Sequence, residues 1–272
     1  MKNFVLKETT WNNIDQLKNE YLDYLKNTPD GFLDSAIYES IPNEIENDDR
    51  EKIGFFTTGK FWNGDTLLTA FYLKSKYYRY AQQLFTKVLK EYKIDRAFVT
   101  SWDELLVSLA FEKMKELNTS FEMQAYFFSQ REKDTVRPAE YSMDCIEKVD
   151  NEGYLNMNEL TDSEWSDEQG KPAYEFYKLT SDGAIMGYGM IYRHFLNNAA
   201  DIGNYTVKEY RRKGVGRSMI MGLSQLMEQK GIMPLVGCWY YNKESLYTLT
   251  SSGYVTPTRL FNVSFVNNTV LS

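Results

Sequence analysis

The chain has 272 residues, 43% of them hydrophobic and 15% aromatic, and a formal net charge of −7. This length allows one large domain or two of ordinary size, and the aromatic content excludes a disordered chain. Two cysteines, Cys145 and Cys238, exclude a disulfide framework and a cysteine-based metal cluster. No apolar run is long enough for a signal peptide or a membrane span, so we expect a cytoplasmic protein with no membrane partner and no metal.

The distribution of charge argues against a nucleic-acid partner. There are 18 basic and 22 acidic residues up to residue 134, and 13 basic and 16 acidic residues after it. Nucleic-acid-binding domains usually carry a basic excess, which both halves lack. The basic residues of the second half nevertheless gather in one place: five of them lie within ten residues, namely Lys208, Arg211, Arg212, Lys213 and Arg217.

Apolar spacing and turn residues predict the elements of the first half. In chain order they are a helix over 9–25, a loop over 42–52, strands over 52–58 and 66–73 joined by a turn at 63–65, a helix over 81–92, a strand over 96–100, a helix capped by Asp103 that extends to Leu117, and a strand over 122–130. Residues 131–140 are charged, contain Pro138 and break the pattern, so they are the predicted linker. The predicted domains are therefore residues 1–134 and 135–272.

The same patterns predict the elements of the second half. They are a strand over 141–148, a polar helix or loop over 162–169, strands over 173–179 and 185–195 around a turn at 181–183, a strand over 201–207, a helix over 216–230 stopped by Gly231, a strand over 235–241, a helix over 244–252 ending at Gly253, and a strand over 259–266.

The two halves share an order of elements. Strand, turn, helix, strand, helix, strand occurs over 66–130 and again over 201–266, and aligning Leu73 with Val207 superposes the 81–92 and 216–230 helices. Because there are two copies of domain size, this indicates a duplicated α/β fold rather than a solenoid.

The segment from Arg211 to Ser218 follows a predicted strand and opens a predicted helix. Two glycines, Gly214 and Gly216, allow a tight turn and a close approach to a ligand. The first amides of a helix have no internal partners, and together with the helix dipole they favour a phosphate or diphosphate. The segment therefore predicts an anion site, although a solvated basic turn would show the same residues.

The stretch Tyr205-Thr206-Val207-Lys208-Glu209-Tyr210-Arg211-Arg212-Lys213-Gly214-Val215-Gly216-Arg217 resembles the acetyl-CoA signature of the GNAT superfamily of N-acetyltransferases. Asn242, Ser245 and the pair Gly253-Tyr254 match the spacing of the family's second motif. The whole chain resembles bacterial members with a degenerate amino-terminal copy. The resemblance implies an α/β (α+β) fold of tandem GNAT-like domains, each a mixed, mostly antiparallel sheet flanked by helices.

The resemblance also implies which residues hold acetyl-CoA. The strand before the signature would bind the pantetheine arm through Tyr205 and Val207, with the Val207 amide near the thioester carbonyl, and the amides of 212–218 would hold the diphosphate. The implied cofactor-binding residues are Tyr205, Thr206, Val207, Arg211, Arg212, Lys213, Gly214, Val215, Gly216, Arg217, Ser218, Asn242 and Ser245. In the first half Tyr80 and Gln82 align with the two glycines, so we expect no cofactor there.

The catalytic residues match the family less well. Leu249 stands where the family usually has a proton-donating tyrosine, and Tyr247 is on the opposite helical face. Ser245 shares the face of Leu249 and is the candidate to hydrogen-bond the thiol, with Tyr240 and Tyr241 as alternatives, and positioning alone can also suffice.

A general base is also missing from its usual place. Gly203 occupies the position where many members have a carboxylate, which leaves Asp201 on the same strand face as the candidate base. His194, the only histidine, is a further candidate because of its ordinary pKa. Cys238 is expected in the core.

The sequence thus favours an acetyl-CoA-dependent N-acetyltransferase that acts on an amine of a small molecule, amino acid or peptide by direct attack in a ternary complex. Two alternatives stay open: an acyl-CoA-binding sensor with weak turnover, and an aminoacyl-tRNA-dependent transferase. The sequence leaves open whether the chain forms a homodimer, and it does not define the amine that accepts the acetyl group.

Overall fold

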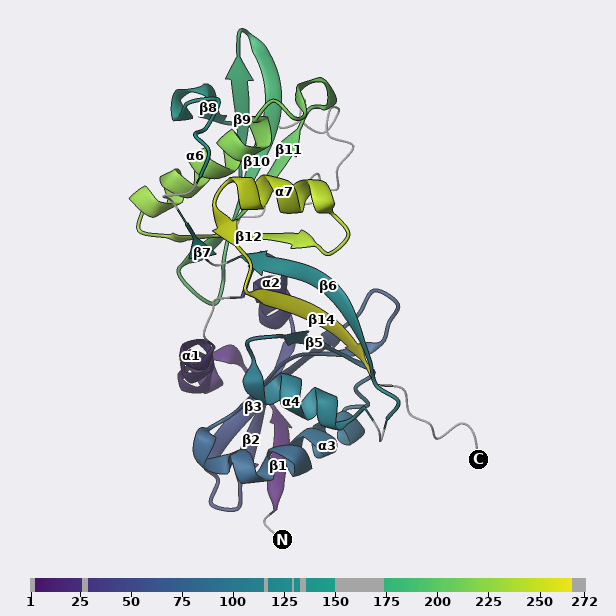
Figure 1. The fold of residues 1–272 in the computed structure, drawn as a ribbon. Helices are drawn as coiled ribbons and strands as arrows, with labels where there is room; N and C mark the ends of the chain where they lie inside the picture. The colour runs from purple at the N-terminus through teal and green to yellow at the C-terminus, as the bar shows by residue number, and fades with distance from the viewer. Residues whose placement is uncertain are drawn as a thin grey trace. The chain divides into compact units, whose positions relative to one another are not determined.

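The computed structural model describes residues 3–25, 29–114, 117–128, 130–132, 136–149 and 174–265. The chain forms two compact units (Figure 1). The first comprises Met1–Thr28, Phe32–Ala125 and Thr258–Ser272, and the second comprises Pro29–Gly31 and Tyr126–Pro257. Each unit therefore includes a segment from the opposite end of the chain. The domain boundary predicted at residue 134 separates the two copies of the repeated order of elements, and it stays a prediction.

The first unit is built on a mixed sheet. Its elements are β1 (Phe4–Glu8), a 3₁₀ turn η1 (Trp11–Ile14), α1 (Asp15–Tyr24), α2 (Gly31–Tyr38), β2 (Ile41–Asn47), β3 (Lys52–Lys60), β4 (Thr66–Leu73), η2 (Ser75–Tyr80), α3 (Ala81–Glu91), β5 (Arg96–Thr100), α4 (Glu104–Glu112), β6 (Ser120–Phe128, of which the residues up to Ala125 belong to this unit) and the last strand, β14 (Thr258–Ser264). The strand order is β1-β2-β3-β4-β5-β14-β6. β4 and β5 are parallel, whereas β1–β2, β2–β3, β3–β4 and β5–β14 are antiparallel.

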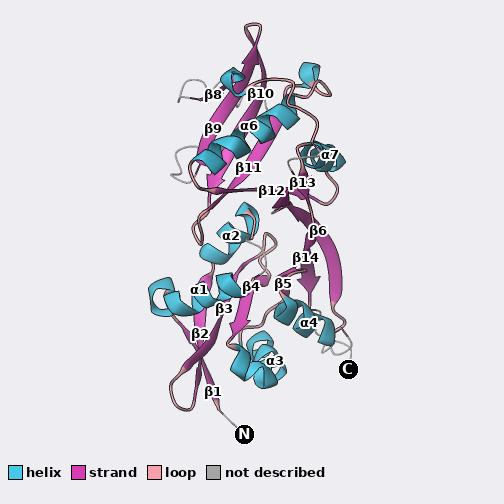
Figure 2. Cartoon of the chain, turned by 60° about the vertical axis from the view of Figure 1, so that its left-hand side comes forward, coloured by secondary structure: helices cyan, strands magenta, loops and turns pink. Residues whose placement is uncertain are grey.

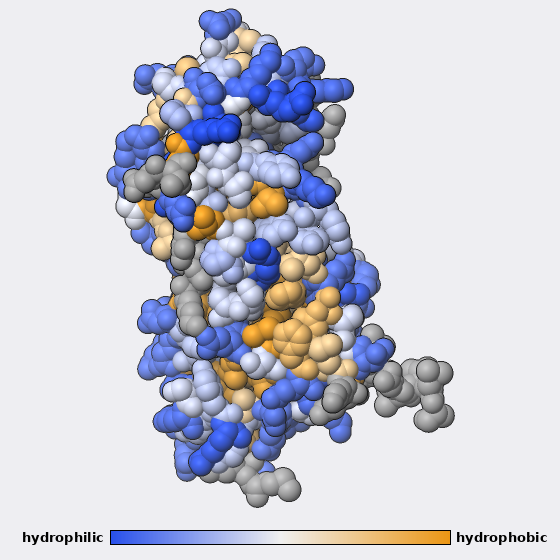
Figure 3. All heavy atoms as spheres, in the orientation of Figure 1, coloured by the Kyte–Doolittle hydropathy of each residue, from blue (hydrophilic) through white to orange (hydrophobic). Residues whose placement is uncertain are grey.

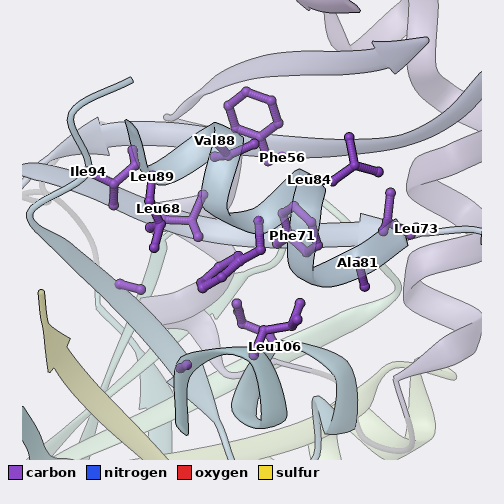
Figure 4. Close-up of a cluster of buried hydrophobic side chains, with 14 of the residues drawn as sticks. Phe56, Leu68, Phe71, Leu73, Ala81, Leu84, Val88, Leu89, Ile94 and Leu106 are labelled. Carbon is purple, nitrogen blue, oxygen red and sulfur yellow. The ribbon is translucent and has the colours of Figure 1, made fainter. Parts of the chain in front are cut away.

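The core of this unit lies between the sheet and α3. Leu84, Phe85 and Val88 follow helical spacing and are fully buried. Figure 4 shows Leu84 and Val88 in one cluster with Phe71 and Leu73 of β4 and Leu106 of α4. The rings of Phe71 and Phe85 meet edge to face at 5.3 Å between centroids.

The second unit is also a sheet covered by a helix. Its elements are β7 (Gln130–Arg131), η3 (Met143–Cys145), β8 (Ile146–Lys148), β9 (Tyr174–Ser181), β10 (Ala184–Arg193), β11 (Ala199–Thr206), η5 (Lys208–Tyr210), α6 (Val215–Gln229), β12 (Met233–Trp239), α7 (Lys243–Ser251) and β13 (Tyr254–Val255). The strands run in the order β12-β11-β10-β9-β8, and β7 pairs with β13 separately. Figure 2 shows α6 lying across one face of β10 and β11.

The apolar stripe of α6 fixes it to that face. Met219, Leu223 and Met227 are buried against Ile202 of β11 and its neighbours. Within this core the hydroxyl groups of Ser224 and Tyr254 are 2.8 Å apart, so the buried tyrosine hydroxyl has a hydrogen-bond partner.

Most predicted elements are confirmed, including the mixed, mostly antiparallel sheets with flanking helices. The loop predicted over 42–52 is wrong: Ile41–Asn47 is strand β2. Its Glu44 side chain is only 2% exposed and pairs with Lys7 and Lys52. Acidic residues normally indicate a surface loop, but the ion pairs with Lys7 and Lys52 offset the cost of burying the Glu44 carboxylate in a strand.

Two smaller differences concern element ends. Of the strand predicted over 141–148, only Ile146–Lys148 is extended. The helix capped by Asp103 ends at Glu112, before Met114 and Leu117. The polar segment 162–169 lies outside the described residues.

Hydrophobic side chains gather on part of the surface of the first unit. Figure 3 shows hydrophobic side chains over α4, β6 and β14 of the first unit, where Phe111 stacks on Phe121 at 4.2 Å between centroids and Phe261 lies 6.1 Å from Phe121. None of the described helices is long and apolar enough to cross a membrane.

The core position of Leu84 gives a stability prediction. Leu84→Ala should lower the free energy of unfolding by about 2–5 kcal/mol, because the removed methyl groups leave a cavity at a fully buried position. Gln83→Ala, an exposed neighbour on the same helix, is the matched control and should change it by less than about 0.5 kcal/mol. Urea unfolding measures both, and equal effects of the two variants would contradict the packing of α3.

Candidate functional site

The site is organised by two strands that separate. β11 and β12 pair in parallel only from Ala199 to Asp201, opposite Met233 to Leu235. β11 remains paired with β10 as far as Thr206, opposite Gly187. Beyond Asp201, therefore, no described strand pairs with the edge of β11 that faces β12, and this edge is left open.

Two backbone hydrogen bonds identify which groups of β11 face this opening. Val207 donates its N–H to Met186 O at 3.0 Å, and His194 donates to Ala199 O at 3.1 Å. Hydrogen-bonded pairs alternate along an antiparallel ladder, so the odd-numbered residues of β11 bond β10, and Asn204 and Thr206 present their backbone groups to the opening. The Val207 amide is thus bonded to β10, and its expected place near a thioester carbonyl stays a prediction.

The turn after β11 leads into an uncapped helix. Gly214 is left-handed, with φ of 79°, and α6 begins at Val215 with no side-chain cap. The first bond of the helix runs from Ser218 N to Gly214 O at 2.9 Å. The amides of Val215, Gly216 and Arg217 thus have no partner within the helix, whereas the Ser218 amide, expected to hold diphosphate, is used within it.

Ser218 has a different role in the structure. Its hydroxyl oxygen accepts the N–H groups of Glu140 and Tyr141 at 3.0 and 3.1 Å. The carboxylate of Glu140 in turn accepts from Arg217 Nη2 at 3.0 Å. These bonds tie residues 140–141 to the first turn of α6.

A groove of about 760 Å³ runs from the open edge of β11 past this turn to α7. Its lining residues are Asn204, Tyr205, Thr206, Arg211, Arg212, Gly214, Val215, Gly216, Arg217, Asn242, Glu244, Ser245, Tyr247, Thr248 and Ser251. Ten of the thirteen residues expected from the motifs line it, and Val207, Lys213 and Ser218 do not. Figure 3 shows strongly hydrophilic side chains over the turn between β11 and α6.

Gly216 keeps this groove open. A Cβ atom at this residue would lie 2.9 Å from Asn204 Nδ2, 3.0 Å from Thr248 Cγ2 and 3.3 Å from Thr206 Oγ1. A side chain here would therefore fill the space between β11, α6 and α7. The contacts also show that Asn204 and Thr206 point their side chains toward α6, so Asp201 lies on the opposite face of the sheet.

The second motif begins α7. Asn242 is its N-cap and accepts from Ser245 N at 2.9 Å, which gives this asparagine a structural role beside any contact to a ligand. Ser245 hydrogen-bonds the Cys238 thiol, and burial, opposed by that hydrogen bond, raises the pKa of Cys238 to about 11. The thiol therefore stays protonated at neutral pH and is no nucleophile.

The tyrosine candidates are distributed over different environments. Leu249, at the usual tyrosine position, is 1% exposed and belongs to the core. Tyr247 is 69% exposed and lines the groove. The rings of Tyr240 and Tyr241 meet edge to face at 5.2 Å between centroids, and both residues lie outside the groove lining.

Asp201 stands at the last paired position of β11, where the opening begins. Gly31, from the Pro29–Gly31 segment of this unit, packs against it, since a Cβ atom at Gly31 would lie 3.0 Å from Asp201 Cβ. The neighbouring Asp30 is buried, and its Oδ2 lies 2.5 Å from the position of a Cβ at Gly237 of β12. Two carboxylates thus flank the start of the opening, and Asp30 was missed because no motif surrounds it.

His194 lies at the other end of the sheet. It pairs with Ala199, and Thr206 is seven residues further along β11, about 23 Å of extended strand. Burial lowers the pKa of His194 to about 4. It is therefore neutral at pH 7 but outside the groove lining. No group of His, Cys, Asp and Glu among the described residues is arranged to hold a metal ion.

The equivalent region of the first unit differs. β4 and β5 also pair in parallel over a short stretch, Leu67 and Leu68 opposite Arg96 and Ala97. The turn before α3 is the 3₁₀ segment Ser75–Tyr80, and the Tyr80 ring packs on Phe4 at 5.2 Å. A bulky side chain thus stands where the second unit has Gly214.

Two family profiles match the chain. One, described as an acetyltransferase (GNAT) domain, matches residues 10–131, and the other, the acetyltransferase (GNAT) family, matches residues 141–253. The chain therefore belongs to the GNAT acetyltransferases and carries two GNAT domains in tandem.

Solved structures share this fold over nearly the whole chain. A GNAT-family acetyltransferase from Colwellia psychrerythraea is 14% identical with a TM-score of 0.78, over 96% of this chain and 99% of the other. A tandem GNAT protein from the clavulanic acid biosynthesis pathway, without AcCoA, is 10% identical with a TM-score of 0.63, over 97% and 98%. A GCN5-related N-acetyltransferase from Sphaerobacter thermophilus is 9% identical with a TM-score of 0.57, over 97% and 96%. At these identities the likeness shows the fold alone.

No curated protein sequence matches the chain.

The burial of His194 gives a pH prediction. Its folded pKa of about 4 lies below the unfolded value of about 6.5, so the unfolded chain binds the extra proton between these values. The stability associated with neutral His194 is present above pH 6.5 and is lost as pH falls toward 4, by up to about 3 kcal/mol. His194→Gln should flatten this part of the unfolding free energy measured against pH. Parallel curves for wild type and variant would contradict the assignment.

Proposed function

We propose that the second unit binds acetyl-coenzyme A and that the protein transfers the acetyl group to an amine of a small molecule, amino acid or peptide in a ternary complex. The observation that carries this proposal is the opening between β11 and β12, which runs directly to the uncapped start of α6. A groove with strand amides along one side and helix amides at one end suits a linear ligand that combines amide groups with a diphosphate.

The residues present fit this ligand. The Val215, Gly216 and Arg217 amides, with Arg211 and Arg212, would hold the diphosphate, since the helix dipole adds to their charge. The backbone groups of Asn204 and the N–H of Thr206 would bond the pantetheine arm in place of Tyr205 and Val207, since the Thr206 carbonyl oxygen already accepts from Arg211 Nε. Arg217 Nε also suits a diphosphate, because this N–H group is buried and has no acceptor among the described residues.

Acetyl-coenzyme A supplies the acetyl group as an activated thioester, and this chain's residues would handle the protons. Asp201 lies about 16 Å along the strand from Thr206, at the start of the opening, and is the proposed base that takes a proton from the acceptor ammonium. Asp30 is the proposed second carboxylate that holds the ammonium there. His194, further from the groove, is the weaker candidate.

Leu249, at the position where the family usually has a tyrosine, is buried in the core and supplies no proton. Ser245 is proposed to hydrogen-bond the cofactor sulfur, since it borders the groove and already bonds a sulfur atom, that of Cys238. Thiolate release would then depend on positioning rather than on a strong acid. The first unit, with Tyr80 at the turn, is proposed to bind no cofactor.

Cofactor binding is tested by Gly216→Val. Acetyl-CoA at 100 times its Kd should stabilise the wild type by about 2.7 kcal/mol, seen as a rise in melting temperature. The added side chain fills the groove, so the variant should lose this rise while it remains folded by circular dichroism. Gln225→Val, at an exposed position on the same helix, is the control and should keep it. A retained shift in Gly216→Val would place the site elsewhere.

Catalysis is tested by Asp201→Asn in a thiol-release assay with a panel of amines. Loss of a general base should lower kcat/KM by about 10²–10⁴-fold, while the acetyl-CoA thermal shift is kept. Asp182→Asn, in the exposed β9–β10 turn, is the matched control and should leave the rate unchanged. An active Asp201→Asn enzyme would remove Asp201 from the mechanism. Binding without turnover of any amine by the wild type would favour the sensor alternative.

A further inference from the structure

A carboxylate of the chain itself lies beside the turn that precedes α6. A Cβ atom at Gly214 would overlap Glu140 Cγ and lie 3.0 Å from Glu140 Cβ, so the Glu140 side chain lies directly over this glycine. The backbone there is fixed to the first turn of the helix, because Ser218 Oγ accepts the N–H groups of Glu140 and Tyr141. Glu140 is therefore held next to the first amides of α6, which have no partner within the helix.

The Glu140 carboxylate is paired with Arg217. Its Oε1 accepts from Arg217 Nη2 at 3.0 Å, and the Arg217 side chain is 12% exposed whereas that of Glu140 is 60% exposed. Nη2 and Nε lie on one edge of the planar guanidinium, the edge that binds a carboxylate or a phosphate through two parallel hydrogen bonds. Glu140 thus uses one of the two donors on the edge that is proposed to face the diphosphate.

The surroundings of Glu140 attract an anion. A cavity of about 610 Å³ at this turn is lined by four cationic side chains, Arg137, Arg212, Lys213 and Arg217, and Glu140 is the one carboxylate among the described residues that line it. These cations and the helix dipole favour negative charge at this place. The chain therefore supplies an anion of its own beside the site at which the anionic part of the cofactor is proposed to bind.

We propose that Glu140 is an internal competitor of acetyl-CoA: the diphosphate must displace its carboxylate from Arg217 Nη2, so this contact weakens cofactor binding. This regulation of the site rests on the proposed function. The Glu140 side chain is mostly exposed, so its carboxylate can turn into solvent while the backbone stays bonded to Ser218. The ion pair also orders Arg217, which favours the cofactor, but the repulsion between two anions beside one guanidinium exceeds the entropy saved by ordering one side chain.

Glu140→Gln tests this competition, because glutamine keeps the size of the side chain and removes its charge. Isothermal titration calorimetry at low salt should give a Kd for acetyl-CoA at least about threefold lower in the variant than in the wild type, as expected from the loss of a partly exposed ion pair. The gain should shrink in about 1 M salt, where the Debye length falls to about 3 Å. In an Arg217→Gln background the same substitution should give a smaller gain, because no guanidinium is left to compete for. The melting temperature of each free variant shows whether it is folded.

Glu147→Gln is the matched control. Glu147 is 62% exposed, pairs with Lys178 at 3.3 Å and lines neither the cavity nor the groove, so its loss should leave the Kd unchanged. An unchanged Kd in Glu140→Gln would overturn the competition, and a higher Kd would do so by making Glu140 a residue that positions Arg217 for the cofactor. An equal gain in Glu147→Gln, or an undiminished gain in the Arg217→Gln background, would overturn it as a general effect of net charge. Failure of the wild type and of every variant to bind acetyl-CoA would instead refute the proposed function itself.

Discussion

The end of the pairing between β11 and β12 at Asp201 is the constraint from which the site follows. Backbone amides and carbonyls removed from water need partners, and beyond this residue one edge of β11 has no strand to supply them among the described residues. An extended ligand with its own amides can take that place. Gly216 leaves room for it, α7 borders it, and the start of α6 closes it with unpaired amides. Each feature would have little use without the open edge.

The cations around the turn are held by local partners rather than left in solvent. Arg211 Nε donates to Thr206 O at 3.2 Å, Arg217 pairs with Glu140, and the Lys213 ammonium lies over the Tyr210 ring at 5.3 Å. Side chains already fixed lose less conformational entropy when an anion binds, which favours affinity. Further contacts, from Ser218 and Arg217, connect residues 140–141 to the helix start, beside the proposed diphosphate site.

Burial determines which titratable groups can act. The high pKa of Cys238 and the low pKa of His194 have the same main cause, desolvation of the charged form, and both groups are neutral at pH 7. Leu249 removes the usual acid altogether. Proton transfer in the proposed reaction therefore falls to the carboxylates at the start of the opening, Asp201 and Asp30, which come from distant parts of the chain and meet on one face of the sheet.

Local patterns determined much of this protein. The glycines of the 211–216 segment require a tight turn before a helix, Asn242 is a sufficient cap for α7, and the apolar spacing of α3 and α6 places each helix on its sheet. These features depend on neighbours within a few residues, so the sequence alone predicted the two GNAT-like units and ten of the residues that line the groove.

Tertiary structure alone decided the rest. Register along β11 depends on hydrogen bonds to β10, so only the fold shows that Thr206, and not Val207, faces the opening. β2 is a strand because it pairs with β1 and with β3, and its buried Glu44 is neutralised by Lys7 and Lys52; the pairing with β1 joins residues far apart along the chain, which no local pattern encodes. The position of Asp30 beside Gly237 and the exchange of β14 into the first unit are contacts across more than 130 residues, which sequence periodicity cannot report because it records only the neighbours of each residue along the chain.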